Sequence, residues 1–176
     1  MAVDLASLIL DVPDFPQPGI GFKDITPLLS SPEGLSAAID QLVAAAPEVD
    51  VVLGMEARGF IFAAPVAYRL RRGFVPVRKL GKLPRQVVSV SYELEYGTDT
   101  VAVHADAVPA GSRVLIVDDV LATGGTVAAT ADLVARLGAQ VTGVVVVAEL
   151  AFLQPRRRLA EHAVGAVTAL VTIEAG

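Results

Sequence analysis

The sequence predicts an α/β fold in which a central, mostly parallel sheet is flanked by helices. Apolar runs of strand length, such as residues 113–119 and 141–150, alternate along the chain with segments of helical periodicity. Such continuous apolar runs are typical of parallel strands whose two faces are both covered by helices. The 176 residues, 53% of them hydrophobic, suit one domain with a substantial core, so we expect residues 1–176 to form a single domain.

The pattern of apolar residues and chain breakers predicts each element in turn. Residues 3–11 have the spacing of a short amphipathic helix, and a Pro- and Gly-rich arm follows them. Residues 31–33, Ser-Pro-Glu, mark the start of a helix that continues to about Ala46. Residues 79–100 suggest a long excursion in the form of a β-hairpin arm. The other expected strands are residues 50–54, 74–77, 113–119, 141–150 and 164–173, and the other expected helices are residues 59–72 and 126–137.

Composition excludes several classes of protein. The sequence has no cysteine, which rules out disulfides, thiolate metal sites and cysteine nucleophiles. A net charge of −5 argues against a general nucleic-acid binder. The apolar run of residues 141–148 is too short to cross a membrane as a helix, and residues 1–10 lack the basic start of a secretory signal. We therefore expect a cytoplasmic protein that binds neither nucleic acid nor membranes.

Positive charge is concentrated in one part of this acidic chain. No acidic residue lies between Glu56 and Glu93, whereas eight of the 14 lysines and arginines do. A segment of one sign on an acidic protein suggests a small, highly anionic ligand. For the arginines of residues 69–72 a solvated helix end is the favoured interpretation. A ligand role is favoured for the cations that follow, namely Arg78, Lys79, Lys82 and Arg85.

The clearest chemical motif is VLIVDDVLATGGTVAAT, residues 114–130. Two adjacent carboxylates end an apolar run, and a turn of small residues then opens a helix. The N–H groups of this turn can converge on one anion, and the helix dipole favours negative charge there by about 0.3–1 kcal/mol. The carboxylates would repel a phosphate, but they can hold the 2′- and 3′-hydroxyls of a ribose. The motif therefore predicts a ribose 5-phosphate site made by Asp118, Asp119, Ala122, Thr123, Gly124, Gly125 and Thr126.

The alternative is an ordinary strand–turn–helix in which Asp119 serves only as a cap. That alternative does not explain why two carboxylates precede a Thr-Gly-Gly-Thr turn. Other phosphate motifs are missing, since the sequence contains neither G-x-x-x-x-G-K-[ST] nor G-x-G-x-x-G.

The same motif carries a resemblance to a known family. VDDVLATGGT resembles the phosphoribosyl-diphosphate signature of the type I phosphoribosyltransferases. DFPQPGIGFKDITPLL (14–29), GMEARGFIFAAPVA (54–67) and FVPVRKLGKLPRQVVSVSYELEYG (74–97) resemble the adenine phosphoribosyltransferase family, in the same order and spacing. The similarity spans roughly Asp14 to Leu159, which is most of the chain.

The resemblance implies a purine salvage enzyme that transfers the 5-phosphoribosyl group of 5-phosphoribosyl-1-diphosphate to adenine, giving AMP and pyrophosphate. It implies the type I phosphoribosyltransferase fold, with a small N-terminal hood (residues 1–30) and a flexible catalytic loop (residues 79–100). Mg²⁺ would bridge the diphosphate and the ribose hydroxyls, close to Asp118 and Asp119 but joined to them through water. A homodimer is implied by the resemblance alone.

The resemblance also implies a diphosphate site. The turn of residues 56–59 follows a strand and precedes a helix, so its N–H groups can meet an anion, and the family often has a strained peptide bond there. Arg58 is either a pyrophosphate contact, which is the favoured role, or the partner of a nearby carboxylate. The expected diphosphate-binding residues are Glu56, Ala57, Arg58, Gly59, Arg78, Lys79 and Lys82.

The base is expected between the N-terminal arm and the acidic pair. Phe22 either stacks on the purine or belongs to the core, and backbone groups of residues 21–23 could favour a 6-amino over a 6-oxo group. Lys23 replaces the arginine usual in the family, so a bidentate contact is lost there. Pro155 replaces a usual glycine, which leaves the local turn open. The expected adenine-binding residues are Gly21, Phe22, Lys23 and Val120.

Glu95 and Tyr96 match the tip of the family's loop, which is expected to close over the site. Glu95 would serve adenine as acid or base, although a solvated strand residue is the alternative. The expected catalytic residues are Glu95, Asp118 and Asp119. Rival functions are a sister enzyme for another base, which the arm of residues 22–24 argues against, and a non-catalytic sensor, for whose DNA-binding element 176 residues leave no room.

Overall fold

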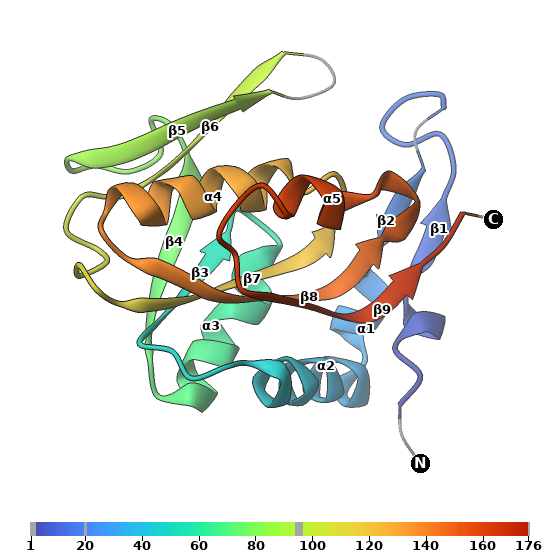
Figure 1. The fold of residues 1–176 in the computed structure, drawn as a ribbon. Helices are drawn as coiled ribbons and strands as arrows, with labels where there is room; N and C mark the ends of the chain where they lie inside the picture. The colour runs from blue at the N-terminus through green and yellow to red at the C-terminus, as the bar shows by residue number, and fades with distance from the viewer. Residues whose placement is uncertain (1–2, 20, 94–96, 176) are drawn as a thin grey trace.

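A computed structural model describes residues 3–19, 21–93 and 97–175 (Figure 1). Within these ranges the chain forms nine strands, five α-helices and two short 3-10 helices. The strands are β1 (Leu10–Val12), β2 (Phe22–Asp24), β3 (Val51–Met55), β4 (Gly73–Lys79), β5 (Val87–Glu93), β6 (Thr98–His104), β7 (Arg113–Leu121), β8 (Gln140–Leu150) and β9 (Ala166–Ile173). The helices are η1 (Ala6–Leu8), α1 (Thr26–Ser30), α2 (Pro32–Ala45), α3 (Gly59–Leu70), α4 (Gly125–Arg136), η2 (Ala151–Leu153) and α5 (Pro155–Leu159).

The main sheet has seven strands in the order β5-β6-β4-β3-β7-β8-β9. β4, β3, β7, β8 and β9 are mutually parallel, whereas β5 and β6 form an antiparallel hairpin that joins the end of β4. Since the parallel strands all run the same way, their carboxyl ends meet at one edge of the sheet, where ligands of such sheets bind. The structure confirms the predicted α/β class and its mostly parallel sheet.

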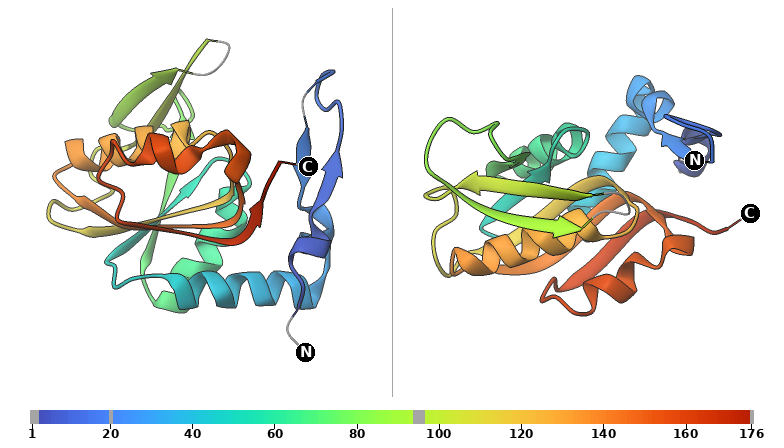
Figure 2. Two further views of the ribbon diagram at one scale, coloured as in Figure 1. Left: turned by 45° about the vertical axis from the view of Figure 1, so that its right-hand side comes forward. Right: turned by 90° about the horizontal axis from the view of Figure 1, so that it is seen from above.

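Two apolar layers explain why the central strands are apolar at every position. Along β3, Val51, Leu53 and Met55 pack with α4 in one core cluster, whereas Val52 packs with α2 and α3 in another. Alternation of this kind recurs in β7 and β8. Figure 2 shows α4 and α3 on opposite faces of the sheet. Because successive side chains point to opposite faces, covering both faces buries every position of a strand.

The predicted start of α2 is confirmed. The Ser31 side chain caps the helix by accepting a hydrogen bond of 2.9 Å from the Gly34 amide, and Pro32 occupies the first turn. A cap of this type is worth about 1 kcal/mol because it satisfies an N–H group that the helix cannot. Within the described ranges, no helix is long and apolar enough to cross a membrane.

The prediction of an amphipathic helix over residues 3–11 was wrong. A single 3-10 turn, η1, is followed by β1, which pairs with β2 through Leu10↔Asp24 and Val12↔Phe22. The pairing partner lies after the Pro- and Gly-rich arm, so local periodicity could not reveal it. The strands β1 and β2 lie within the predicted hood, residues 1–30, and their two-stranded sheet stands apart from the main sheet beside the ends of β8 and β9 (Figure 1).

The predicted hairpin arm is present, and its strands extend to His104, beyond the predicted boundary. We call β5 and β6 the hairpin stem. It lies along α4 (Figure 1), where Val90 is buried in the same core cluster as α4. The Arg136 guanidinium, at the end of α4, donates a hydrogen bond of 2.9 Å to the Ser89 carbonyl. The stem is therefore packed against the helix rather than projecting into solvent.

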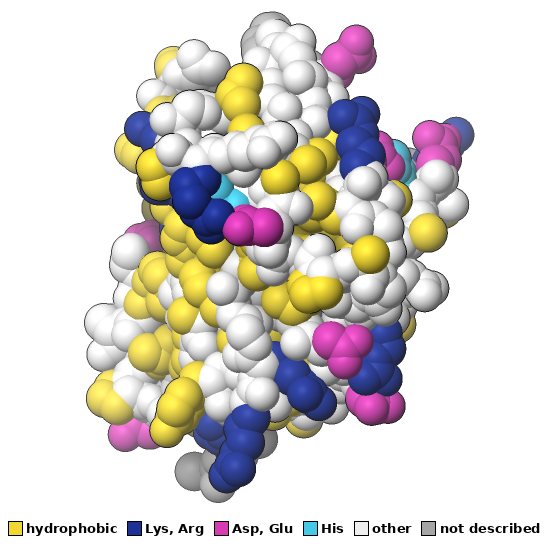
Figure 3. Space-filling model, turned by 90° about the vertical axis from the view of Figure 1, so that its left-hand side faces the viewer, with side chains coloured by type: hydrophobic (Ala, Val, Ile, Leu, Met, Phe, Trp, Pro, Cys, Tyr) yellow, Lys and Arg dark blue, Asp and Glu magenta, His cyan; other side chains and the backbone are white. Residues whose placement is uncertain are grey.

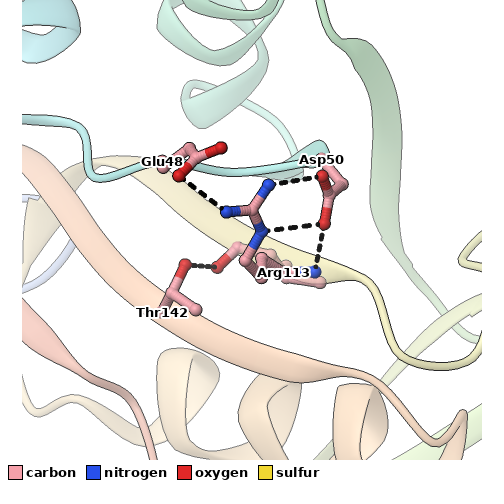
Figure 4. A network of polar contacts seen from close by, with 5 residues as sticks. Glu48, Asp50, Arg113 and Thr142 are labelled. Atoms are coloured by element: carbon pink, nitrogen blue, oxygen red, sulfur yellow. Dashed lines mark hydrogen bonds and ion pairs between the residues drawn. The ribbon is translucent and has the colours of Figure 1, made fainter.

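A polar network ties together the opposite edge of the sheet, where the parallel strands begin (Figure 4). Arg113, the first residue of β7, makes a bidentate contact of 2.9 and 3.1 Å with Asp50 and an ion pair of 2.9 Å with Glu48. The hydrogen bonds from the Arg113 side chain and amide hold the pKa of Asp50 well below its usual range. This network joins the segment before β3 to β7, far from the carboxyl ends of the strands.

Candidate active site

The acidic pair lies at the carboxyl end of β7, as predicted. Asp119 is only 5% exposed, and its Oδ2 lies 2.7 Å from Arg58 Nε. The N–H of Arg58 is not aligned for a hydrogen bond, and no other described group donates to this oxygen. The ion pair compensates the charge of this buried oxygen but leaves its hydrogen-bonding capacity unused, so a ligand can supply a donor. Asp119 is thus a candidate to accept a hydrogen bond from a bound hydroxyl.

Asp118 is held close to the turn that precedes α3. Its Oδ1 accepts a hydrogen bond of 2.9 Å from the Asp119 amide, and a Cβ on Gly59 would come within 2.6 Å of the same oxygen. Only glycine at position 59 allows this approach. Burial, and then the neighbouring Asp119 carboxylate, raise the pKa of Asp118 well above its usual range. The Asp118 carboxyl therefore resists ionisation until a ligand compensates its charge.

The loop of residues 122–126 opens α4 with its backbone donors free. Gly124 is the N-cap with a φ of +79°, and no side chain caps the helix. A Cβ on Gly124 would also press against the Pro155 carbonyl at 3.2 Å. Both observations favour glycine at position 124. Because no side chain caps α4, its first N–H groups remain available to a ligand bound in this loop. We call this loop, including Ala122, Thr123, Gly124, Gly125 and Thr126, the cup.

Arg58 connects three expected parts of the site. Besides its ion pair with Asp119, its guanidinium lies 4.9 Å from the centre of the Phe22 ring, in cation–π geometry. The Glu56–Ala57 peptide bond before it is cis. An ion pair with a nearby carboxylate was one of the two roles predicted for Arg58, and the structure contains it. Contact of Arg58 with a diphosphate stays a prediction. The hood, the turn of residues 56–59 and the acidic pair therefore meet at one guanidinium.

The cations expected for a diphosphate are paired with carboxylates. Arg78 makes a bidentate contact of 3.0 and 3.2 Å with Glu56, and this contact lowers the pKa of Glu56. Lys79 Nζ lies 3.1 Å from Asp99, which raises the pKa of Lys79. Lys82 contributes its carbonyl, which accepts a hydrogen bond of 3.1 Å from Arg78. The positive segment is thus partly neutralised by acids that lie at or beyond its ends in sequence.

Other cations of that segment lie on the surface, and the arginines of residues 69–72 form the solvated helix end that was predicted. Arg69 pairs with Asp40 at 2.6 Å on the surface. Arg85 pairs with Asp106 at 2.6 Å, with both side chains more than half exposed, and its expected contact with a ligand stays a prediction. Asp106 lies two residues after the end of β6, so this ion pair holds Arg85 at the base of the hairpin.

Two cavities flank the cup. A cavity of about 700 Å³ lies on the hood side and includes Gly21, Lys23 and Thr123 in its lining. A second cavity of about 230 Å³ lies on the hairpin side and is lined by Glu56, Arg78, Lys79, Tyr92, Asp99 and Thr126, among others. Gly21 and Lys23, two of the residues expected for the base, thus border one cavity. Glu56, Arg78 and Lys79, three of those expected for the diphosphate, border the other. The cup lies between the two.

The structure gives the surroundings of three residues expected at the base site, Phe22, Lys23 and Val120. Phe22 is half-buried and packs edge-on against Phe15 with ring centres 5.1 Å apart. Lys23 Nζ lies 2.9 Å from Asp11, so the lysine pairs with β1 instead of reaching across the cavity. Val120 is half-buried against the core cluster that includes α2 and α3. None of these positions tests contact with a base, which stays a prediction.

Several residues around the site escaped the sequence reasoning. Leu150 and Ile173 line the larger cavity at the carboxyl ends of β8 and β9, together with Phe152. The rule that ligands bind beyond strand ends could have pointed to both strand termini. Tyr92 and Asp99, in the hairpin stem, gave no local signal because only the packing of the stem on α4 brings them to the cup.

Pro155, where the family resemblance left the turn open, begins α5 after Gln154, which has a φ of +51°. Next to it, Arg156 makes a fork of contacts of 2.7 to 3.0 Å with Glu149, which is 3% exposed. This pair fixes α5 against the end of β8, below the cup. Gly124 and Pro155 are in contact as a result.

The loop residues Glu95 and Tyr96 lie outside the described residues, so their expected roles stay predictions. Within the described part of the chain, no group of three or more acidic or histidine side chains is arranged to hold a metal ion.

Comparison with known proteins identifies relatives over almost the whole chain. Residues 23–167 match the family described as phosphoribosyl transferase domain. The chain is 62% identical over 170 residues to an adenine phosphoribosyltransferase of Cutibacterium acnes, with 96% of each chain covered. A solved adenine phosphoribosyltransferase of Rhodothermus marinus is 51% identical, with a TM-score of 0.90 and 96% of each chain covered. A solved adenine phosphoribosyltransferase of Saccharomyces cerevisiae, in complex with an imino-altritol bisphosphate and adenine, is 40% identical. Its TM-score is 0.86, and the match covers 94% of this chain and 96% of the yeast chain.

Proposed function

The chain belongs to the adenine phosphoribosyltransferase family, and from this premise we propose that it transfers the 5-phosphoribosyl group of 5-phosphoribosyl-1-diphosphate to adenine. The products are AMP and pyrophosphate, which makes the reaction one of purine salvage. The observation that carries the proposal is the buried Asp119 carboxylate oxygen without a hydrogen-bond donor, next to a helix whose first N–H groups have no side-chain cap. A ribose 5-phosphate supplies a hydroxyl donor for the first and an anion for the second.

The two cavities suggest how the substrates divide between them. The hood-side cavity, with Leu150 and Phe152 in its lining, suits a flat, largely apolar base. The hairpin-side cavity, with Arg78 and Lys79, suits the diphosphate, which would displace Glu56 and Asp99 from these cations. The ribose then lies between them over Asp118 and Asp119. We propose that Arg58 leaves Asp119 for the diphosphate once a ribose hydroxyl satisfies that carboxylate.

Catalysis in this arrangement depends on positioning and preorganised charge. Breaking the bond between the anomeric carbon and the diphosphate builds positive charge on the ribose and negative charge on the leaving group. The ionised acidic pair stabilises the ribose side, and the arginine and lysine side chains stabilise the leaving group. Substrates held between the hood and the hairpin stem would be shielded from the water that hydrolyses the donor. Glu95, at the hairpin tip, is proposed to exchange a proton with adenine.

Mg²⁺ fits this site through the substrate. Two adjacent carboxylates are too few for a dedicated protein cage, but Asp118 and Asp119 would hold the water shell of a substrate-bound Mg²⁺. The unsatisfied Asp119 oxygen and the raised pKa of Asp118 agree with a site that gains from a nearby cation. When bound, the ion would neutralise charge on the leaving diphosphate. The acidic pair orients that water shell and the sugar.

We further propose that the protein is a cytoplasmic homodimer. Ile61, Ala64 and Tyr68 form an exposed stripe on α3, and Tyr68 is 81% exposed. Leu80, directly after β4, is also exposed. Hydrophobic side chains gather along one side of the molecular face in Figure 3. An apolar surface of this kind is typical of a protein–protein interface.

The direct test is conversion of radiolabelled adenine to AMP with the sugar donor and Mg²⁺. The wild-type protein should convert adenine, and guanine, hypoxanthine, xanthine and orotate should fail to replace it. Asp119→Asn should lower kcat on the order of 10²-fold, because it removes one preorganised charge from the ribose side.

Exposed Asp132, on the surface of α4, provides a matched control, and Asp132→Asn should keep wild-type turnover. Normal turnover by Asp119→Asn would remove Asp119 from the mechanism. A wild-type protein that left adenine unchanged under all these conditions would refute the proposed function.

A further inference from the structure

Tyr92 joins the hairpin stem to the cup. Its hydroxyl lies 3.0 Å from Thr126 Oγ1, on the first turn of α4. The phenol ring lies against the same turn, since a Cβ on Gly125 would meet Tyr92 Cδ2 at 3.3 Å. Tyr92 and Thr126 both border the smaller cavity. A residue 34 positions earlier in the sequence is therefore in contact with the proposed phosphate site.

The number of protons in this contact determines its direction. Each hydroxyl has one proton to donate and two lone pairs to accept with. A bound phosphate offers only acceptors at neutral pH, so Thr126 has to spend its single proton on the phosphate. The Tyr92 hydroxyl must then be the donor in the contact with Thr126. The alternative direction, from Thr126 to Tyr92, would leave the phosphate without that proton.

Asp99 is the competing acceptor for the Tyr92 proton, and other groups hold it. Asp99, which shares the smaller cavity, accepts a hydrogen bond of 2.8 Å from the Thr100 amide and pairs with Lys79 at 3.1 Å. Burial opposes the charged form of Asp99, but the Thr100 amide, then Lys79 and to a smaller extent Tyr92 lower its pKa. Among the described residues, the Tyr92 hydroxyl lies within hydrogen-bond distance of Thr126 and not of Asp99, so the geometry favours Thr126 as the acceptor of its proton.

We propose that the Tyr92 hydroxyl is a positioning group for the 5′-phosphate, which turns the Thr126 proton toward the phosphate and couples the hairpin stem to the occupied cup. The inference rests on the proposed role of the cup. A phosphate that is held through both the free substrate and the transition state affects binding more than the chemical step. Loss of the hydroxyl should therefore weaken phosphate-bearing ligands and leave phosphate-free ligands unchanged.

The test compares the dissociation constants of AMP and adenosine for Tyr92→Phe, measured by calorimetry. AMP should bind about fivefold more weakly, the usual effect of one lost hydrogen bond, while adenosine binding stays at the wild-type value. In kinetics, KM for the sugar donor should rise by a similar factor, with kcat and KM for adenine unchanged. The ring is retained in this variant, so the packing against Gly125 is preserved.

Ser91→Ala is the matched control. It removes a hydroxyl from the same strand, where Ser91 contacts Thr100 at 2.8 Å on the exposed side of the stem. This variant should bind AMP and adenosine like the wild type. In a Thr126→Val background, Tyr92→Phe should have no further effect on AMP binding, because its partner is already gone.

Three outcomes would overturn the inference, and a fourth would overturn the proposed role of the cup. Equal weakening of AMP and adenosine by Tyr92→Phe would mean that Tyr92 acts on the fold in general, which overturns the inference. So would an unchanged AMP affinity, or a full Tyr92→Phe effect in the Thr126→Val background. If the wild type bound AMP no better than adenosine, the cup itself would be wrong, and the inference would fall with the proposed function.

Discussion

At the scale of single residues, the site is a set of charges in a partly dry environment. Asp118 and Asp119 are adjacent, and only Arg58 lies within ion-pair distance of the pair among the described residues. Burial and like charge disfavour the ionised form of Asp118, and this is why its pKa is raised. The residues that make the site able to hold a sugar diol therefore make the ligand-free fold less stable at neutral pH.

This conflict predicts that Asp118→Asn stabilises the fold while it lowers activity. A carboxylate whose folded pKa exceeds its unfolded pKa loses stability as pH rises from the unfolded value through the folded one. Asparagine keeps the oxygen that accepts from the Asp119 amide but does not titrate. The Tm of the Asp118→Asn variant should exceed that of the wild type by a few degrees at pH 8, at about 2–4 °C for each kcal/mol of added stability. This gain in Tm should vanish below about pH 4, where the Asp118 carboxyl is protonated in both the folded and the unfolded protein. A gain of equal size at all pH values would show that charge is not its cause.

At the scale of elements, the polar contacts of one arginine hold the short helix α5 in place. α5 has five residues, too few for a stable helix on its own. The fork between Arg156 and Glu149 joins it to the end of β8, and Arg156 also donates to the Val167 carbonyl on β9. α5 in turn supports the cup through the contact of Pro155 with Gly124.

Arg156→Ala should therefore destabilise the protein by roughly 3 kcal/mol, since it leaves the Glu149 carboxylate buried without a partner. Urea unfolding measures the change. Adding Glu149→Gln to this variant should restore part of the stability, because it removes the unpaired charge. Arg157→Ala, on the exposed side of the same helix, is the control and should change stability by less than about 0.5 kcal/mol. Equal losses for the two arginines would contradict the role of the fork.

At the scale of the whole molecule, stability and function are concentrated at opposite edges of the sheet. The Arg113 network binds the start of β7 to the segment before β3, whereas the cup, the hood and the hairpin surround the carboxyl ends (Figures 1 and 4). The exposed stripe of α3 faces away from both core clusters and is the part of the surface that a second copy would cover.

Ile61→Asp should convert the proposed dimer to a monomer, because it places a charge at the centre of the apolar stripe. Sedimentation velocity of the wild type and the variant at equal concentration measures this. Ala135→Asp, an exposed apolar-to-acidic change on α4, should leave the oligomeric state unchanged. A wild-type protein that sediments as a monomer at micromolar concentration would contradict the homodimer.

The sequence by itself determined the α/β class, most strand positions, the cup and the acidic pair. These features are local: apolar runs mark buried strands, and a carboxylate pair before a Thr-Gly-Gly-Thr turn marks one strand end. Only the tertiary structure decided that β1 pairs with β2, that Arg58 contacts both Asp119 and Phe22, and that Tyr92 reaches Thr126. Each of these contacts joins residues that are far apart in the chain. Their positions depend on how the layers pack, and no short pattern of residues encodes that packing.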